Sequence, residues 1–290
     1  MLAGPVVEGR VREPSGIGVQ GAQVTLLQGP GDRTQVRRTD ADGSFRFRAF
    51  EGPAAISVML PKGWTVEGPT EIKLKPLGDR TEQADFKAHA RRVLRGKLLV
   101  RAGEELAPLS KASIGTAQTD EQGAFSLEGL AAGRTELAAD LLPAAAIEMP
   151  AGPAEVARDI VLVAPALRGK AEPEALIEVA GQRLRVVPQP PAERPIADWA
   201  EGRPMSDSEI SAVERLSALA NLDPSFRLLL VAAPRPGELG RAIQAAMTLR
   251  RYLTGPGLVP RERLTFAIGK VARRGVLALI LTRVEPLGER

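Results

Sequence analysis

The chain has 290 residues, of which 44% are hydrophobic, 26% charged and only 3% aromatic, and its formal net charge is +4. This composition is typical of a globular protein of two or three domains with aliphatic cores. The absence of cysteine excludes disulfides, thiolate metal sites and cysteine nucleophiles. Because arginine and lysine are interspersed with acids, the positive excess does not indicate nucleic-acid binding.

One phrase occurs twice in the first half of the chain. Thr39–Phe47 reads TDADGSFRF, and Thr119–Leu127, 80 residues further on, reads TDEQGAFSL. Each copy predicts a turn at Asp and Gly, followed by a strand whose polar and apolar side chains alternate. A period of about 80 residues suits a small β-sandwich, so the sequence predicts two tandem modules.

The first module, residues 1–88, is predicted from short alternating segments at Val6–Val11, Gly21–Leu27 and Ala55–Trp64, together with the first copy of the phrase. It resembles the carboxypeptidase-regulatory-like and collagen-adhesin B-type families, which carry G-x-V, G-A-x-V-x-L, T-D-x-x-G-x-F-x-F and P-x-G-[YW] in this order. The resemblance implies an antiparallel, Ig-like or prealbumin-like sandwich that serves as a spacer or adhesive surface.

The second module, residues 89–164, is predicted to be a degenerate copy of the first. Its first strand falls at Leu94–Leu98 and its turn phrase is intact, but the G-A-x-V-x-L strand has decayed to Ala112–Gly115. The polar and basic stretch Lys87–Arg92 is interpreted as the linker between the modules. His89, the only histidine, is interpreted as a solvated linker residue.

The last part, residues 165–290, changes to a mixed α/β pattern. A hairpin of Leu176–Val179 and Leu184–Val187 is followed by a proline-rich loop that reaches Trp199. Ser206 and Glu209 have the spacing of a capping box and predict a helix start. A buried strand, a second helix and two final strands then follow, at 226–231, 238–253, 264–268 and 276–281. The predicted unit is β-α-β-α-β-β, a layer of helices on a mixed sheet.

This part resembles the OmpA-like peptidoglycan-binding domain through Leu249–Leu253, Gly257–Thr265 and Gly275–Leu279, which match its motifs in order. Members of that family hold diaminopimelate with an Asp in T-D-x-x-G and an Arg in L-S-x-x-R-A. Here Arg235 lies near the position of that Asp and Ala245 replaces that Arg. The resemblance therefore implies a divergent OmpA-like domain whose standard murein binding is lost.

Two apparent chemical motifs have simpler interpretations. Gly16–Gly21 spells the dinucleotide fingerprint but precedes a strand instead of a helix, which indicates a tight turn. Asp40–Gly43 resembles part of a calcium loop, yet Arg38 stands where its first acidic ligand belongs, so a β-turn is preferred. No catalytic residue, metal ligand or cofactor is predicted.

We interpret the sequence as a non-catalytic protein of the periplasm or surface of a bacterium, with its signal peptide removed and no transmembrane segment. Arg235, Arg250, Arg251 and Trp199 are the candidate contact surface for an envelope protein or polymer. Two alternatives stay open: a peptidoglycan anchor with relocated ligand residues, and an accessory region of a larger secreted enzyme or adhesin. Residues 165–200 could also form a module of their own, because Gly169-Lys170 repeats the pairs at Gly9 and Gly96.

Overall fold

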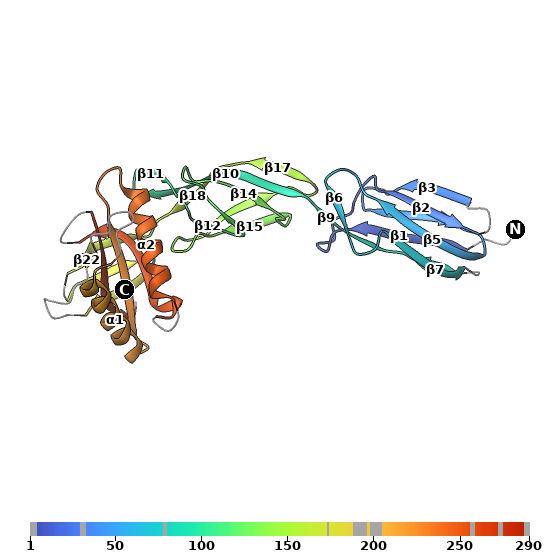
Figure 1. Cartoon of the computed structure of the whole chain (residues 1–290). Helices are drawn as coiled ribbons and strands as arrows, with labels where there is room; N and C mark the ends of the chain where they lie inside the picture. Colours follow the sequence, from blue (N-terminus) through green and yellow to red (C-terminus); the bar gives the residue numbers. More distant parts are fainter. Residues whose placement is uncertain are drawn as a thin grey trace. The chain divides into compact units, whose positions relative to one another are not determined.

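The computed structural model describes residues 5–29, 33–77, 80–172, 174–187, 196–197, 205–255, 259–271 and 275–286. Strands dominate the described residues, and the helices α1 and α2 both lie in the last part of the chain (Figure 1). The chain divides into two compact units. Unit 1 comprises Met1–Leu94, Leu127–Thr135 and Ile147–Ala157, and unit 2 comprises Arg95–Ser126, Glu136–Ala146 and Arg158–Arg290.

Most of unit 1 is a β-sandwich made of two sheets. The first has the order β4-β1-β9-β6, with β8 also paired to β1. Its strands are β1 (Val6–Arg12), β4 (Ser44–Arg48), β6 (Trp64–Glu67), β8 (Thr81–Gln83) and β9 (Phe86–Ala90). The second has the order β3-β2-β5-β7, with β2 (Gln23–Gln28), β3 (Arg33–Arg38), β5 (Gly52–Met59) and β7 (Glu71–Leu77). The alternating segments of the sequence are therefore confirmed as strands.

Alternation along the strands builds the core of this sandwich. Val7 and Val11 of β1, Val24 and Leu26 of β2 and Phe47 of β4 are fully buried in one cluster, because every second side chain of each strand points inward. Gly9 also faces inward, and a Cβ added there would lie 2.0 Å from the Ala84 carbonyl oxygen. Glycine is thus required where β1 approaches the chain that leads from β8 to β9.

The repeated phrase has the same bonding in both copies. In the first, the buried Thr39 hydroxyl donates to the Val19 carbonyl at 2.5 Å and accepts from the Ala22 amide at 2.9 Å. In the second, the Thr119 hydroxyl donates to the Leu109 carbonyl at 2.6 Å and accepts from the Ala112 amide at 2.9 Å. The turn glycines also agree, with φ of +79° at Gly43 and +78° at Gly123. The predicted duplication is therefore present in the backbone.

The strands between 92 and 163 follow the first sandwich directly. They are β10 (Arg92–Ala102), β11 (Glu105–Pro108), β12 (Ser113–Ile114), β13 (Ala117–Gln118), β14 (Ala124–Glu128), β15 (Gly133–Leu137), β16 (Ala145–Met149), β17 (Ala154–Ala157) and β18 (Ile160–Val163). β10 pairs with β11, β14, β17 and β18, while β12 pairs with β13 and β15 with β16. The second copy thus keeps the turn but shortens the strands beside it, since β12 and β13 have two residues each.

The interpretation of Lys87–Arg92 as a linker is wrong. β9 ends at Ala90 and β10 begins at Arg92, so one residue separates the two strands. The segment alternates as a strand does: Ala88 and Ala90 are buried, whereas Lys87 and His89 point outward. The polar residues of this strand are those that point outward, and this is why the sequence of the strand resembles that of a linker.

The rest of unit 2 contains a seven-stranded mixed sheet with the order β21-β20-β19-β24-β23-β25-β22. Its strands are β19 (Ala166–Lys170), β20 (Leu176–Val179), β21 (Gln182–Val186), β22 (Ile196–Ala197), β23 (Phe226–Ala233), β24 (Leu264–Lys270) and β25 (Val276–Glu285). The described residues of 165–187 therefore pair with the same sheet as the later strands. β21 also pairs with β25, from Arg183 opposite Glu285 to Val186 opposite Thr282, so this sheet closes on itself.

Closure of the sheet creates an interior and leaves an outer side for the helices. Leu229 and Val231 of β23 lie in one buried cluster with Ile177, Leu184 and Ala267 from other strands. The alternate residues of β23 point to the opposite side, where α1 (Asp207–Leu222) and α2 (Leu239–Leu253) contact this strand. The sequence predicted the layer of helices on a mixed sheet but not the closure.

A local signal fixes the start of helix α1. α1 begins with the predicted capping box, in which the Ser206 hydroxyl accepts from the Glu209 amide and the Glu209 carboxylate accepts from the Ser206 amide. The short 3-10 helix η2 (Arg261–Arg263) precedes β24. Among the described residues, no helix is long and apolar enough to cross a membrane.

Candidate functional site

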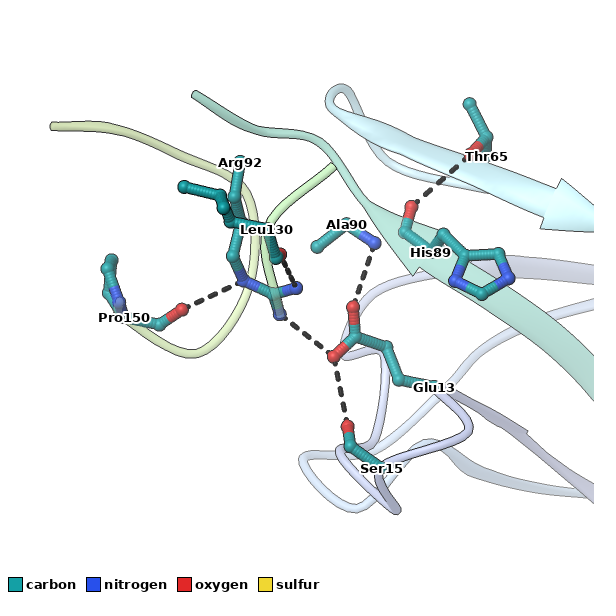
Figure 2. A network of polar contacts seen from close by, with 8 residues as sticks. All are labelled: Glu13, Ser15, Thr65, His89, Ala90, Arg92, Leu130 and Pro150. Atoms are coloured by element: carbon teal, nitrogen blue, oxygen red, sulfur yellow. Dashed lines mark hydrogen bonds and ion pairs between the residues drawn. The ribbon is translucent and has the colours of Figure 1, made fainter. Parts of the chain in front are cut away.

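The most deeply buried ion pair of the described chain lies in unit 1 and joins Glu13 to Arg92 (Figure 2). Glu13 directly follows β1 and Arg92 is the first residue of β10, so each side chain is positioned by the end of a strand. The Arg92 Nη2 and Glu13 Oε2 atoms are 2.8 Å apart, and the two side chains are only 3% and 5% exposed.

Each guanidinium nitrogen and each carboxylate oxygen of this pair has a hydrogen-bond partner. Arg92 also donates from Nε to the Pro150 carbonyl at 2.9 Å and from Nη1 to the Leu130 carbonyl at 3.3 Å. Figure 2 shows the guanidinium between these two carbonyls and the carboxylate. Glu13 accepts from the Ala90 amide at 2.9 Å and from the Ser15 hydroxyl at 3.2 Å. A buried charge needs such saturation to repay its desolvation.

The network also sets the charge state of Glu13. Burial by itself would raise the pKa of the carboxyl, but the hydrogen bonds from Arg92 and from the Ala90 amide outweigh it, and the pKa of Glu13 lies below its ordinary value of 4.5. The pair is therefore ionised at neutral pH. Geometrically, it ties the turn after β1 to two backbone carbonyls that lie far along the chain, at Leu130 and Pro150.

Two exposed ion pairs lie in the same part of unit 1. Arg91 contacts Glu128 at 3.1 Å, with side chains 64% and 56% exposed. His89 Nε2 lies 2.9 Å from the Glu67 carboxylate, and its backbone carbonyl accepts from the Thr65 hydroxyl (Figure 2). His89 is thus solvated, as predicted, but it belongs to strand β9. Water screens these exposed contacts, so they contribute less to the stability of unit 1 than the buried Glu13–Arg92 pair does.

A second group of contacts, within unit 2, involves helix α2. The N-cap residue of α2, Glu238, makes no side-chain hydrogen bond to the start of the helix. Glu105 Oε1 accepts instead from the Gly237 amide at 3.1 Å and from the Leu239 amide at 3.3 Å. A carboxylate in this position satisfies free amides and complements the helix dipole. At Gly240, an added Cβ would lie 2.9 Å from the Pro108 carbonyl oxygen, so α2 packs closely against β11.

The predicted contact residues Arg250 and Arg251 lie at the other end of α2. Both approach the carboxylate of Asp140, at 3.8 Å and 3.4 Å. Burial lowers the pKa of Arg250 despite the nearby Asp140 charge. Arg251 is 53% exposed. Part of the predicted basic surface is therefore engaged within unit 2.

The other predicted contact residues are not brought into this group. Arg235 is exposed in the turn after β23, and its guanidinium lies over Gly275, where an added Cβ would be 3.1 Å from Nε. Trp199 lies outside the described residues. The sequence does not single out Glu13 and Arg92, because nothing in the local pattern distinguishes them from solvated charges.

One shallow cleft of about 620 Å³ lies on the first sheet of the sandwich. Its charges are largely balanced across strands: Glu8 faces Arg46 at 3.8 Å, and Arg12 faces Asp85 at 3.9 Å. Such a balanced, solvated row does not prepare a carboxylate or a nucleophile for catalysis.

Comparison with known proteins bears mainly on the first sandwich. Residues 6–87 match the carboxypeptidase regulatory-like domain. The comparison with curated proteins finds no match.

Three solved structures are similar to part of this chain. The Bacillus anthracis TIE protein is 13% identical with a TM-score of 0.32, and the match covers 56% of this chain and 34% of that one. A streptococcal ancillary pilin is 11% identical with a TM-score of 0.27, over 55% and 62% of the two chains. BcpA, the major pilin subunit of Bacillus cereus, is 9% identical with a TM-score of 0.30, over 62% and 80%. With TM-scores this low, none of the three informs the function of this chain.

Proposed function

We propose that this chain is a non-catalytic structural and binding protein of the bacterial cell envelope. Its β-sandwich modules act as spacers, and its last domain contacts an envelope protein or polymer. The match of residues 6–87 to the carboxypeptidase regulatory-like domain supports the spacer role, as does the repeated bonding around Thr39 and Thr119.

The Glu13–Arg92 pair is the observation that carries this proposal. An apolar pair of the same volume would stabilise the fold as well or better, so a buried ion pair is a poor device for stability alone. The pair instead constrains geometry. Three hydrogen bonds from one planar guanidinium fix the Leu130 and Pro150 carbonyls against the turn after β1. A fixed contact of this kind suits a spacer, whose segments must keep their positions.

Distances between paired spin labels on the full chain test whether the Arg92 contacts fix this part of unit 1. The chain has no cysteine, so labels go only to Glu71→Cys and Ala151→Cys, both at exposed positions of unit 1. We expect a narrow distance distribution that broadens in Arg92→Ala. The matched control is Arg91→Ala, which removes a neighbouring arginine from the exposed pair with Glu128 and should leave the distribution narrow. Equal distributions in all three proteins would contradict the spacer role.

The finer part of the proposal is that the last domain is a divergent OmpA-like domain. The order of α1, β23, α2, β24 and β25 supports it, since the sequence predicts a helix, a strand, a second helix and two final strands in the region that carries the resemblance. Tyr252 and Leu253 lie at the end of α2, where the matched motif requires a helix end. Arg235 and Ala245 are the departures that lead us to propose loss of murein binding.

Co-sedimentation of the full chain with diaminopimelate-type murein tests this finer part. We expect the natural chain to stay in solution and a variant with Arg235→Asp and Ala245→Arg to pellet. If the natural chain pellets, the protein is instead a peptidoglycan anchor with relocated ligand residues. If neither protein pellets, the OmpA-like assignment fails while the spacer role is untouched.

A further inference from the structure

Strand β3 is an open edge of the first sandwich. It pairs with β2 along all six of its residues, from Arg33 opposite Gln28 to Arg38 opposite Gln23. Among the residues that the structure describes, β2 is its only sheet neighbour, and Figure 1 shows β3 at the border of its sheet. The far side of β3 therefore pairs with no other described strand, and such a sheet edge can template a further strand.

This edge is strongly basic. Arg33, Arg37 and Arg38 are all exposed, and so is Arg48 of the neighbouring strand β4. Within the described part of the chain, none of these four arginines has a carboxylate within 4.0 Å, whereas Arg46 of β4 approaches Glu8 at 3.8 Å. The edge thus carries exposed positive charge along a side that pairs with no other described strand.

The edge is also held in an extended, accessible form. Gln35 of β3 donates from Nε2 to the Arg48 carbonyl at 2.8 Å, which ties β3 to the border strand of the other sheet. The Gln28 side chain bonds both the amide and the carbonyl of Phe50, at 3.2 and 3.1 Å. The Arg33 guanidinium lies over the Phe50 ring at 5.2 Å. β3 is therefore already in an extended conformation before another strand pairs with it.

The side chains of β3 separate into two kinds. Arg33, Gln35 and Arg37 pair with Gln28, Leu26 and Val24, which point into the sandwich, so these three lie on the side that faces β4. Thr34, Val36 and Arg38 lie on the outer side, and Val36 is 54% exposed. A complementary strand would place acidic residues on one side and β-branched residues on the other.

We propose that β3 is a docking edge for an extended acidic segment of a partner protein, which adds to the sheet as a further strand. A second copy of this chain fits badly, because pairing β3 with itself would bring arginines together. An anionic polymer such as a charged polysaccharide would be attracted to the arginines but could not pair with the backbone of β3 as a strand does. The inference goes beyond the proposed function and does not depend on how the last domain contacts the envelope.

Binding of a defined peptide tests the proposal on the full chain. The probe is a fluorescein-labelled eight-residue peptide that alternates glutamate with valine and threonine, measured by fluorescence polarisation. We expect binding in the micromolar to millimolar range, and hydrogen–deuterium exchange should show new protection of amides within 33–38. No binding below about 1 mM peptide, or binding without protection of these amides, would overturn the proposal.

Two controls separate strand addition from attraction by charge. Arg33→Glu with Arg37→Glu should weaken binding about tenfold, because two exposed charge contacts are replaced by repulsion. Lys73→Glu with Lys75→Glu makes the same change in net charge on β7, the opposite edge of the same sheet, and should leave binding within about twofold. Equal weakening by the two variants would show long-range attraction alone and contradict docking at β3.

The second control changes the peptide. Methylation of the alternate amide nitrogens that face β3 keeps every charge and side chain but removes the N–H groups that would donate to the β3 carbonyls. We expect this peptide to bind at least about tenfold more weakly than its parent, since the hydrogen bonds from its amides to the β3 carbonyls are lost. If both peptides bind equally well, the edge attracts anions without pairing, and the proposal is wrong.

Discussion

Removing the Arg92 side chain should destabilise unit 1 far more than removing its neighbour. Arg92→Ala leaves the Glu13 carboxylate, 5% exposed, without its cation, and the Pro150 and Leu130 carbonyls lose the hydrogen bonds that Arg92 donates. Loss of one partner of a buried pair costs about 3–5 kcal/mol. Glu13 keeps its bonds from the Ala90 amide and Ser15, so we expect a value near the lower end, about 3 kcal/mol. Arg91→Ala, which breaks an exposed pair, should cost no more than about 1 kcal/mol.

Urea unfolding followed by tryptophan fluorescence measures this difference. Trp64 lies beside Gly152 in unit 1, and a Trp199→Phe background makes it the sole tryptophan. A double-mutant cycle with Glu13→Leu and Arg92→Met should show strong coupling, with the double variant recovering most of the stability lost in Arg92→Met. If Arg92→Ala and Arg91→Ala shift the transition equally, the buried network contributes nothing specific and the reasoning fails.

Three further predictions concern other positions. The folded-state pKa of Glu13 lies below its ordinary 4.5, so the contribution of its carboxylate to stability is complete above that value and is lost as pH falls through the folded pKa. Between pH 7 and 3, Glu13→Gln should therefore lose less free energy of unfolding than the natural chain, measured by urea titration. Gly240→Val should place carbon against the Pro108 carbonyl and destabilise unit 2 by about 1–3 kcal/mol, measured by circular dichroism in urea; an unchanged midpoint would mean that α2 does not pack closely on β11. Ser206→Ala should cost about 1 kcal/mol in the same assay through loss of the capping box, whereas Ser206→Asp should retain most of the stability.

Features that depend on neighbouring residues could be predicted from the sequence. The turn at Asp40 and Gly43 needs a residue that tolerates positive φ, and the strand after it alternates visibly, so both copies were found. The capping box at Ser206 is equally local. In each of these cases the physical cause lies within one turn of chain, which a pattern of residue types records directly.

Features that join distant parts of the chain could not be predicted. Glu13 and Arg92 are 79 residues apart, and Glu105 is 134 residues from the Leu239 amide that it caps. Closure of the last sheet depends on where β21 meets β25, and no local signal carries that register. A charged residue in sequence looks the same whether it becomes solvated, as Arg91 is, or buried, as Arg92 is.

The two copies of the repeated phrase indicate what defines this module. The second copy has lost the long strand that follows Ala22 in the first, and β12 and β13 have only two residues each. It nevertheless keeps a fully bonded buried threonine, 3% exposed at Thr119 and 4% at Thr39. An unsatisfied hydroxyl at either site would cost about 1–3 kcal/mol, comparable to a large part of a small domain's stability. The threonine and its turn are therefore retained where the strand has shortened, so the bonded turn, more than strand length, is what the two copies share.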